Sequence, residues 1–581
     1  MTENPGDNPQ TIPVSGSGSR SLVPLRTMQW ALKLSVITGA SKNLAVASIA
    51  VDQPQPPLMG GQSSISITSN SMDQRRSFVQ AVGTPNVTVR IAGNVELDLS
   101  GLRDVAVAPG VKILGDRSVN RQGPRLFTTT FPANLFVLTE SDNVRISGIR
   151  LDGGESDDPY SAVDTDDANG ILVNSSLNVQ IDHNEIYRWR GAGVVVRDTV
   201  VVGGVGRINR INAATVWVHD NYIHHDQHPT GDTFGGGHGA GYGVEVGYGA
   251  YALIEKNVFD YNRHAIMGDG KPNTGYMAYR NLILGNGGVN SATWHTHQID
   301  MHGTGSDCHA ECGAAGEYMD VEYNTIQYID GTGVKLRGTP QVGMTVENNV
   351  FAHTNVNAFL LSPGAMDQTE TGLSQRNNTF GSNAFYDDRK SCDFDGDGTS
   401  DAFRASGVTW WYQSSALAGR WVYLNQSSTG VADVTLGDTN SDGLCDVNAG
   451  GTIFPTSIDV VSIKPIANVS STVGASFRVQ LSAIGGVRPY TWSATGLPTG
   501  VVLDPATGVL SGTTSQPGAF TVAYTVTETN GISAVGGFSA LVKIPAVSGA
   551  RIAAARSGQG WLPVFGTDSA DRVVQYQPNI P

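Results

Sequence analysis

The sequence has little charge, few basic residues and few cysteines. Only 15% of its 581 residues are charged and 71 are glycine, a composition that suits turn-rich β structure better than a helical bundle. Lys and Arg number 37 against 52 Asp and Glu, which gives a net charge of −15. This balance argues against a nucleic acid or an anionic membrane as the partner. The length exceeds one ordinary domain, and the apolar content is ample for more than one core.

The N-terminal region lacks an apolar run long enough to span a bilayer. Residues 1–62 form a polar leader in which only residues 28–50 are apolar, and Lys33 and Lys42 interrupt that segment. The segment is either a degenerate export signal ending at Ser48-Ile49-Ala50 or a plain leader. We therefore expect no membrane span here.

A repeated corner is the main feature that is present. Seven times an asparagine stands between two short apolar pieces, at spacings of 24 to 43 residues. The seven are Asn184, Asn221, Asn257, Asn281, Asn324, Asn349 and Asn378. Stacked coils of a parallel β-helix need short strands joined by bends, and asparagine suits a bend because it tolerates the left-handed region. Since its amide can also bond to the equivalent amide one coil away, the repeat predicts an asparagine ladder.

A second alternating segment follows each corner, and we interpret it as one strand per coil, stacked in register. If the Ile and Val positions point inward, the intervening residues form two outward columns. The first column is Leu172, Val195, Glu245, Met267, Asp300, Lys335 and Leu360. The second is Asn174, Arg197, Gly247, Asp269, His302, Arg337 and Ser362. Because charge gathers in the four middle coils, we expect a functional groove there.

Several segments before these coils carry a family resemblance. An amphipathic helix is predicted at residues 71–82, where it would plug the open end of a β-helix, and GVKILGDRS and NVRISGIRLDG follow it from Gly110 and Asn143. With the corner asparagines, residues 63–385 resemble the pectate-lyase-like superfamily of right-handed parallel β-helix proteins. The resemblance implies that the ladder lies between the second and third sheets. It places the active groove on the next strand, which here carries the two columns.

The groove residues are our candidates for chemistry. The predicted catalytic residues are Lys335, Arg337, Asp300, His302, Asp269 and Glu245. The predicted substrate-binding residues are Arg197, His224, His225, His228, His238 and His297, most of them from a His- and Gly-rich loop that also contains Asp232. The alternative is a solvated ladder of surface ion pairs with no chemical role.

Two mechanisms fit these residues. In the first, which resembles alginate and pectate lyases, Ca²⁺ held by Glu245, Asp269 and Asp300 neutralises a uronate carboxylate, and Lys335 removes the C5 proton for β-elimination. In the second, two carboxylates act as acid and base in an inverting hydrolysis, which resembles polygalacturonases. Their NTD, DD and RIK motifs are absent as written, and Lys335 and Arg337 stand in the reverse order.

Three further expectations accompany these mechanisms. A C5-epimerase and a non-catalytic carbohydrate-binding adhesin stay open beside the lyase and the hydrolase. We expect the partner to be a polysaccharide and the protein to be a monomer.

Two acidic loops follow the predicted β-helix, in residues 391–455. They place oxygen ligands at alternate positions around a Gly-assisted turn, which is how Ca²⁺ is held. The ligands would be Asp393, Asp395, Asp397 and Asp401 in one loop and Asp438, Asn440, Asp442 and Asp446 in the other. The loops resemble the calcium loops of FG-GAP repeats, although the segment is too short for a whole propeller. Two solvated acidic turns are the alternative.

The C-terminal part is predicted to be an Ig-like β-sandwich over residues 456–546, followed by a tail over residues 547–581. Evenly spaced strands with Gly and Pro turns favour the sandwich, and GLPTGVVLDPATGVLSGT resembles Ig-like modules of exported bacterial proteins. Such modules usually hold an enzyme near a surface or substrate.

The four cysteines form two candidate pairs, Cys308 with Cys312 and Cys392 with Cys445. Such pairs indicate disulfides and an oxidising compartment, so we expect a secreted or cell-surface protein. A zinc site using Cys308, His309 and Cys312 is the alternative, and it would need a fourth ligand from outside the loop.

Overall fold

The chain divides into two compact units, 1–56 and 57–581, and all described residues belong to the second. The computed structural model describes residues 64–117, 121–155, 157, 168–202, 205–209, 215–227, 240–291, 294–304, 313–353, 359–361, 373–381, 390–457, 461–463, 466–484, 489–528, 533–545, 564–567 and 573–576. Within these ranges no helix has the length and apolar character that crossing a membrane requires.

Three parallel sheets, here called A, B and C, form a parallel β-helix. Sheet A consists of β1 (Ser64–Ile67), β2 (Thr88–Ile91), β5 (Lys112–Gly115), β8 (Arg145–Ser147), β11 (Val179–Asp182), β16 (Val216–His219), β19 (Tyr251–Glu255), β22 (Gly275–Tyr279), β27 (Tyr318–Glu322), β30 (Gly343–Glu347) and β33 (Leu373–Arg376). Sheet B consists of β3 (Glu96–Asp98), β6 (Arg125–Phe127), β9 (Arg150–Asp152), β12 (Glu185–Tyr187), β17 (Tyr222–His224), β20 (Val258–Asp260), β23 (Leu282–Ile283), β28 (Thr325–Ile326), β31 (Val350–Phe351) and β34 (Thr379–Phe380). Sheet C consists of β4 (Val105–Ala106), β7 (Asn134–Thr139), β10 (Asn169–Asn174), β13 (Ala192–Arg197), β18 (Tyr242–Gly247), β21 (His264–Gly268), β26 (Ile299–Met301), β29 (Val334–Leu336) and β32 (Phe359–Leu361).

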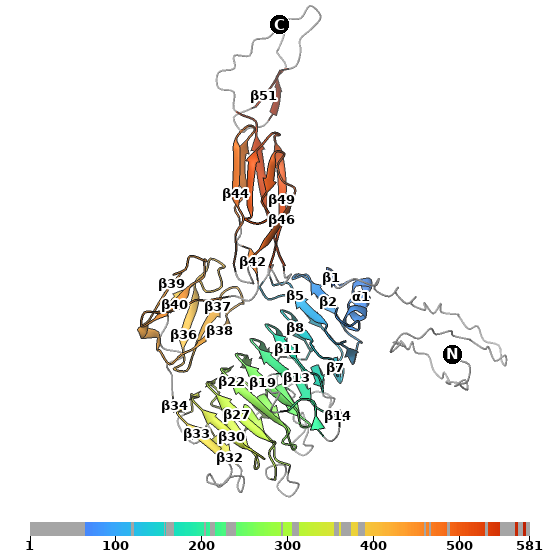
Figure 1. Cartoon of the computed structure of the whole chain (residues 1–581), viewed down its shortest axis with the longest axis vertical. Coiled ribbons are helices and arrows are strands. Elements are labelled where there is room, and N and C mark those ends of the chain that lie inside the picture. Colours follow the sequence, from blue (N-terminus) through green and yellow to red (C-terminus); the bar gives the residue numbers. More distant parts are fainter. Residues whose placement is uncertain are drawn as a thin grey trace, which may run out of the picture. The chain divides into compact units, whose positions relative to one another are not determined.

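Each coil contributes one strand to each sheet, and the coils stack in chain order (Figure 1). The inward positions of the strands are buried aliphatic residues that form one continuous core, including Ile181, Ile223, Ile266 and Ile299. Short strands with a period of two therefore account for the architecture, because every coil must bury one face against its own interior. The predicted parallel β-helix is confirmed.

The register of sheet C confirms the first predicted column. Leu172 pairs with Val195, Val195 with Glu245, Glu245 with Met267, Met267 with Asp300, and Asp300 with Lys335. In the second column Asp269, His302 and Arg337 directly follow the paired residues Gly268, Met301 and Leu336.

The asparagine ladder lies at the corner between sheets A and B. Each side-chain amide donates to the Oδ1 of the next asparagine, as from Asn221 to Asn257 at 2.9 Å, and to a backbone carbonyl of the preceding coil, as from Asn221 to Ile181 at 2.9 Å. The ladder runs through Asn184, Asn221, Asn257, Asn281, Asn324, Asn349 and Asn378. The predicted ladder is confirmed.

The predicted amide bonding is thus correct, but the prediction that these asparagines adopt the left-handed conformation is wrong. The left-handed conformation belongs to the residue before each asparagine, with φ from 53° at Asp220 to 58° at Asn348. These seven residues are His183, Asp220, Lys256, Arg280, Tyr323, Asn348 and Asn377. Asparagine is needed for its inward amide, which supplies both a donor and an acceptor to neighbouring coils.

The predicted N-terminal helix is α1 (Met72–Val82), with Ser71 as its N-cap. The Ser71 hydroxyl accepts from the backbone N of Gln74, which satisfies one of the free donors at the helix start. The helix lies beside β1 and β2 (Figure 1) and buries Phe78, Ala81 and Val82 in the β-helix core. A helix that caps the open end of the β-helix must bury its apolar face in this way.

Antiparallel sheets follow the β-helix. A four-stranded sheet holds β35 (Lys390–Cys392), β36 (Asp401–Ala405), β37 (Thr409–Ser414) and β38 (Arg420–Gln426). After the 3₁₀ helix η4 (Val431–Asp433), a three-stranded sheet holds β39 (Val434–Gly437), β40 (Asp446–Ala449) and β41 (Thr452–Phe454).

The Ig-like part holds β43 (Val469–Thr472), β50 (Ser533–Lys543), β49 (Gly518–Thr527) and β46 (Thr491–Thr495) in one sheet and β44 (Ser476–Gln480), β48 (Val509–Thr513) and β47 (Val501–Leu503) in another. Two-stranded pairs are β14 (Val201–Val202) with β15 (Val205–Gly206), β24 (Val289–Ser291) with β25 (Trp294–His295), β42 (Ser462–Ile463) with β45 (Ala483–Ile484), and β51 (Val564–Thr567) with β52 (Val573–Tyr576). Phe477, Trp492, Tyr524 and Phe538 share one core between the two Ig-like sheets, so the predicted β-sandwich is confirmed.

A second, shorter ladder lies at the corner between sheets B and C. The backbone N of Trp189 donates to Oδ1 of Asp226 at 2.8 Å, and the backbone N of Asp226 donates to Oδ1 of Asn262 at 3.0 Å. The Asn262 amide also donates to the Ile223 carbonyl at 2.9 Å. Asp226 thus occupies an amide position, and its fully buried Oδ2 has no hydrogen-bond partner among the described residues. Burial raises the pKa of Asp226 well above its ordinary value.

The ladder predicts a large loss of stability for Asn281→Ala. The substitution removes the side-chain bonds to Asn257, Asn324 and Ile254 and leaves the buried backbone N of Asn257 without its acceptor, and each buried polar group left unpaired costs about 1–3 kcal/mol. Urea or thermal unfolding should show a loss of about 3 kcal/mol or more for Asn281→Ala and a smaller one for Asn378→Ala, which is only partly buried. Similar small losses for both variants would contradict this role of the ladder.

Asp226→Asn should stabilise the protein at neutral pH. The raised pKa keeps the folded carboxyl protonated while the unfolded chain ionises above about pH 4, so the wild type loses stability with rising pH at about 1.4 kcal/mol per pH unit. Asparagine does not ionise and can donate to the preceding coil as Asn262 does. Unfolding midpoints measured at pH 4 and pH 7 should show the gain mainly at pH 7. An equal gain at both values would assign it to packing and not to ionisation.

Candidate functional site

The outer face of sheet C carries a buried ionic cluster around Asp300. Ile299 and Met301 point into the core, so Asp300 between them points outward, yet its side chain is fully buried. Oδ2 lies 2.9 Å from Nε2 of His297, 2.9 Å from Nε2 of His302 and 2.6 Å from Nη2 of Arg337. A second bond joins Nε of Arg337 to Oδ1 at 3.1 Å, which makes the pair bidentate.

The electrostatics of this cluster keep Asp300 ionised. Burial alone would raise the pKa of the carboxyl, but His297, His302 and Arg337 outweigh it and hold the pKa well below its usual range. Burial lowers the pKa of His297 to about 4 despite the adjacent carboxylate. One buried anion is therefore surrounded by a guanidinium and two imidazole rings.

Strand register brings Lys335 next to this cluster. Lys335 pairs with Asp300 on the adjacent strand and is only half-buried. The His302 side chain is 25% exposed, whereas those of His297 and Arg337 are 6% and 12% exposed. The outermost polar groups are thus Lys335 and His302, with the buried carboxylate behind them, an arrangement suited to proton transfer.

His264 extends the cluster and was missed at the sequence level. Its ring stacks on His297 at 4.3 Å and on Tyr242 at 5.4 Å, and its Nδ1 bonds to the His297 carbonyl. Nε2 of His264 is buried without a hydrogen-bond partner among the described residues. Burial lowers the pKa of His264 well below its usual value. A signal was present, because Tyr242, His264 and His297 stand three residues before Glu245, Met267 and Asp300 in a common register.

Glu245, Asp269 and Asp300 do not converge on one point. Among the described residues the grouped candidate metal ligands are His264, His297 and Asp300, and separately Asp393, Asp395 and Asp401. The Glu245 carboxylate bonds to Arg197 at 2.8 Å. The carboxylate of Asp269 accepts from the backbone N of Tyr248 and Lys271 and from Thr274, so it holds the turn after β21. These carboxylates do not fit a shared calcium ion, and no chemical step is assigned to one there.

An exposed aromatic ring lies beside these pairs. Tyr248 is 45% exposed and directly follows β18. The Lys271 ammonium lies 3.2 Å from its ring centroid and the Arg197 guanidinium 5.2 Å. The two cations hold the ring in place, and an exposed ring of this kind can stack on a sugar.

The predicted histidine loop is divided by the structure. His224 ends β17 and lies with His225 on the outer face of sheet B, whereas the columns lie on sheet C. His224 bonds to Glu185 at 3.1 Å, and Glu185 also pairs with Arg420 of β38. Both histidines line an open cavity of about 400 Å³ with Arg125, Arg150 and Arg188. His228, Asp232 and His238 lie outside the described residues.

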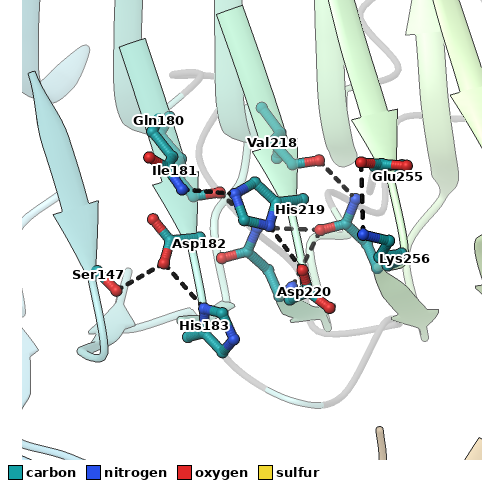
Figure 2. Close-up of polar contacts among 12 residues, drawn as sticks. Ser147, Gln180, Ile181, Asp182, His183, Val218, His219, Asp220, Glu255 and Lys256 are labelled. Carbon is teal, nitrogen blue, oxygen red and sulfur yellow. Dashed lines mark hydrogen bonds and ion pairs between the residues drawn. The ribbon is translucent and has the colours of Figure 1, made fainter. Parts of the chain in front are cut away.

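A second polar cluster lies on the outer face of sheet A, and Figure 2 shows it. Asp182 accepts from Ser147 at 2.7 Å and contacts Nδ1 of His183 at 2.8 Å. His219 bridges Gln180 at 2.8 Å and Asp220 at 2.6 Å. The repeated triplets Asp-His-Asn at residues 182–184 and His-Asp-Asn at residues 219–221 were a usable signal.

This sheet A cluster does not resemble a nucleophile site. Ser147 and His183 both bond to Asp182, whereas an activated serine must bond to the histidine itself. Burial would raise the pKa of Asp182, but Arg145 and His183 lower it strongly, as in a structural ion pair. These hydrogen bonds and ion pairs therefore stabilise the outer face of sheet A.

The two acidic loops differ in whether three carboxylates are grouped, because Asn440 stands in the second loop where Asp395 stands in the first. In the first, carboxylate oxygens of Asp393, Asp395 and Asp401 lie within 4.8 Å of one another, as an oxygen-ligated cation requires. Asp395 and Asp401 are buried, and burial together with the Asp395 charge raises the pKa of Asp401 to about 6. Asp397 lies beside them and accepts from the Ser415 hydroxyl at 2.9 Å.

Side chains of both loops accept from backbone N–H groups of their own turn, as Asp393 accepts from Gly398 in the first loop and Asp438 accepts from Gly443 in the second. Asp438, Asn440 and Asp442 accept from backbone N–H groups at 2.8–2.9 Å, and Asp446 accepts from Thr439 and Thr456. A disulfide joins Cys392 to Cys445 and so links the two loops, as predicted. Cys308 and Cys312 lie outside the described residues.

One family model matches the chain. Residues 459–543 match the family described as "Putative Ig domain", which coincides with the observed β-sandwich. No curated protein matches the sequence.

Two kinds of solved structure show limited similarity. A "putative alpha-galactosidase/melibiase" from Bacteroides fragilis is 24% identical over 14% of this chain, with a TM-score of 0.13. A second such protein from that organism is 24% identical over 16%, with a TM-score of 0.14, and the chain spans only 17% and 19% of the lengths of the two. The phiAB6 tailspike, in complex with oligosaccharides of Acinetobacter baumannii surface polysaccharide, is 9% identical over 81% of this chain and 85% of its own, with a TM-score of 0.21. At these TM-scores none of the three carries weight for the site.

Proposed function

We propose that the protein is an exported carbohydrate-active enzyme that cleaves a uronate-containing polysaccharide on the outer face of sheet C. The observation that supports this is the Asp300 cluster, a buried carboxylate that orients His302 and Arg337 beside Lys335. Such pre-oriented groups favour proton transfer over simple ion pairing. The reaction that uses all of them is β-elimination.

In this mechanism Lys335 takes the proton from C5 of the uronate. The C5–H electrons form the C4–C5 double bond while the bond from C4 to the glycosidic oxygen breaks. His302, held by Asp300, donates a proton to the leaving oxygen. Arg337 binds Asp300 through Nε and Nη2, which would leave Nη1 for the uronate carboxylate.

Substrate would be held along the face of sheet C. Tyr248, exposed and fixed by two cations, would stack on a sugar ring about two coils from Asp300. Coils are spaced by about 4.8 Å, so Tyr248 and Lys335 would contact different sugar units of one chain. This favours a polymer over a single sugar as substrate.

Lys335→Ala and His302→Gln should each reduce turnover by about 10²–10⁴-fold, because each removes a positioned proton-transfer group. The measurement is the ultraviolet absorbance of unsaturated uronate released from a panel of acidic polysaccharides. Lys112→Ala is the matched control, because Lys112 is an exposed lysine of sheet A, and it should leave the rate unchanged.

The same panel of polysaccharides distinguishes the lyase from the other functions considered above. New reducing ends without unsaturated product would indicate hydrolysis, and C5 inversion without cleavage would indicate an epimerase. Binding without any change of the polymer would indicate an adhesin. Wild-type rates in both Lys335→Ala and His302→Gln would show that the reaction does not take place at this cluster.

We also propose that Asp393, Asp395 and Asp401 hold a structural Ca²⁺ ion. The support is the grouping of three carboxylates on a loop that the Cys392–Cys445 disulfide anchors. When bound, the ion would neutralise crowded carboxylates and stiffen the loop, and it would take no part in turnover.

The effect of Asp395→Asn on thermal stability should have opposite signs with and without calcium. In EDTA the variant should melt at or above the wild-type temperature, because one crowded charge is gone; in excess Ca²⁺ it should melt below, because a ligand is lost. Asp442→Asn, in the loop without the grouped carboxylates, should change the calcium response less. A wild-type melting temperature that is identical in EDTA and in Ca²⁺ would refute the site.

A further inference from the structure

The polar group that the mechanism above leaves unused is His264. It is fully buried, and it lies on β21 directly behind the Asp300 cluster. Its Nδ1 bonds to the carbonyl of His297, which requires Nδ1 to carry the proton. Nε2 therefore carries a lone pair, and it is buried with no hydrogen-bond partner among the described residues. A buried acceptor without a donor costs about 1–3 kcal/mol, so it calls for a ligand.

His297 is held in the same tautomer. Its Nδ1 lies 2.8 Å from the Thr296 hydroxyl, and its Nε2 lies 2.7 Å from Nη2 of Arg337, which can only donate. The Nε2 lone pair of His297 thus points to the same side as the Asp300 carboxylate, at 2.9 Å. A backbone or hydroxyl partner on Nδ1 is the usual way in which a ligating imidazole is fixed.

The two imidazoles and the carboxylate meet at one place. One ligand atom each from His264, His297 and Asp300 lies within 4.8 Å of the others, and all three residues are buried. Ring stacking at 4.3 Å holds the two histidines parallel. Two neutral imidazoles with one carboxylate are a donor set for a divalent first-row transition ion, since Ca²⁺ and Mg²⁺ prefer oxygen ligands alone.

We propose that His264, His297 and Asp300 form a binding site for a divalent transition ion, with Zn²⁺ as the first candidate. Three protein ligands would leave a position open for water or another group. The site is distinct from the carboxylate loop of residues 393–401. It shares Asp300 with the proposed cleavage site, but its test is independent of that reaction, because metal content can be measured without any substrate.

Arg337 is the competitor of the ion. Its Nη2 lies 2.7 Å from His297 Nε2 and 2.6 Å from Asp300, which is the side from which an ion would approach both. Metal binding would therefore displace one guanidinium contact, while the bond from Nε to Oδ1 at 3.1 Å could persist. A shorter neutral side chain at residue 337 should strengthen metal binding. If the cluster is only an ion pair, the same change should leave the protein without metal and less stable.

The experiment measures metal on the purified full chain. Protein is stripped with a chelator, returned to buffer with excess Ca²⁺ to fill oxygen sites, and titrated with Zn²⁺ or with Co²⁺, whose visible spectrum reports nitrogen ligands. We expect one equivalent of bound ion in the wild type. His264→Gln, which preserves most of the side-chain volume, should weaken binding on the order of 100-fold or more. Arg337→Gln should tighten it.

Controls make each outcome decisive. His225→Ala removes a histidine that directly follows β17 of sheet B, and this variant should bind like the wild type. Circular dichroism and the melting temperature show whether each variant is folded; if His264→Gln does not fold, the wild-type Co²⁺ spectrum and Arg337→Gln carry the test. Folded wild type that binds neither ion overturns the proposal. Binding that persists in His264→Gln but is lost in Cys308→Ser/Cys312→Ser also overturns it, because the metal then belongs to the cysteines.

Discussion

The asparagine ladder is the constraint on which the rest of the molecule depends. Each amide ties its own coil to both neighbours, through one bond to the next asparagine and one to a carbonyl of the preceding coil. Because these groups are buried and mutually satisfied, a coil cannot slip by one residue without losing several bonds at once. The register of sheet C follows, and with it the placing of Glu245, Met267, Asp300 and Lys335, residues far apart in sequence, on one line.

This dependence explains how much of the fold could be predicted from the sequence. The asparagines recur because every one performs the same inward function, so the ladder, the strands and both columns were predictable. The left-handed residue before each asparagine was not assigned, because its side chain points outward and its type varies widely: His183, Asp220, Lys256 and Tyr323 occupy the position, and only asparagine occurs there twice. A sequence pattern reveals a position only where the fold restricts the side chain. At the residue before each asparagine the fold restricts the backbone conformation and not the side chain.

Partners of side chains were less predictable than positions. Register placed Asp269 beside the groove, but the turn after β21 directs its carboxylate to backbone N–H groups. His224 was expected at the groove, yet it is the last residue of a sheet B strand and bonds to Glu185. His264 was overlooked because it begins its strand three residues before the charged column, where burial is not evident from sequence. Turn geometry and the depth of burial determine which partners these side chains have, and neither can be derived from a sequence period of two residues.

The Asp300 cluster is not something that the fold itself requires. In the same column Val195 and Met267 are buried, so this position accepts an apolar side chain without harm to the sheet. An ionised carboxylate there loses its hydration, and a buried ion pair often gives no more stability than apolar residues of similar size. On sheet A, by contrast, Asp182, His219 and Glu255 follow one another in register, and a polar residue at each coil is the rule. The stability of the coil therefore does not explain a fully buried carboxylate at this position, in contact with two histidines and an arginine, and this is why the proposed chemistry is placed there.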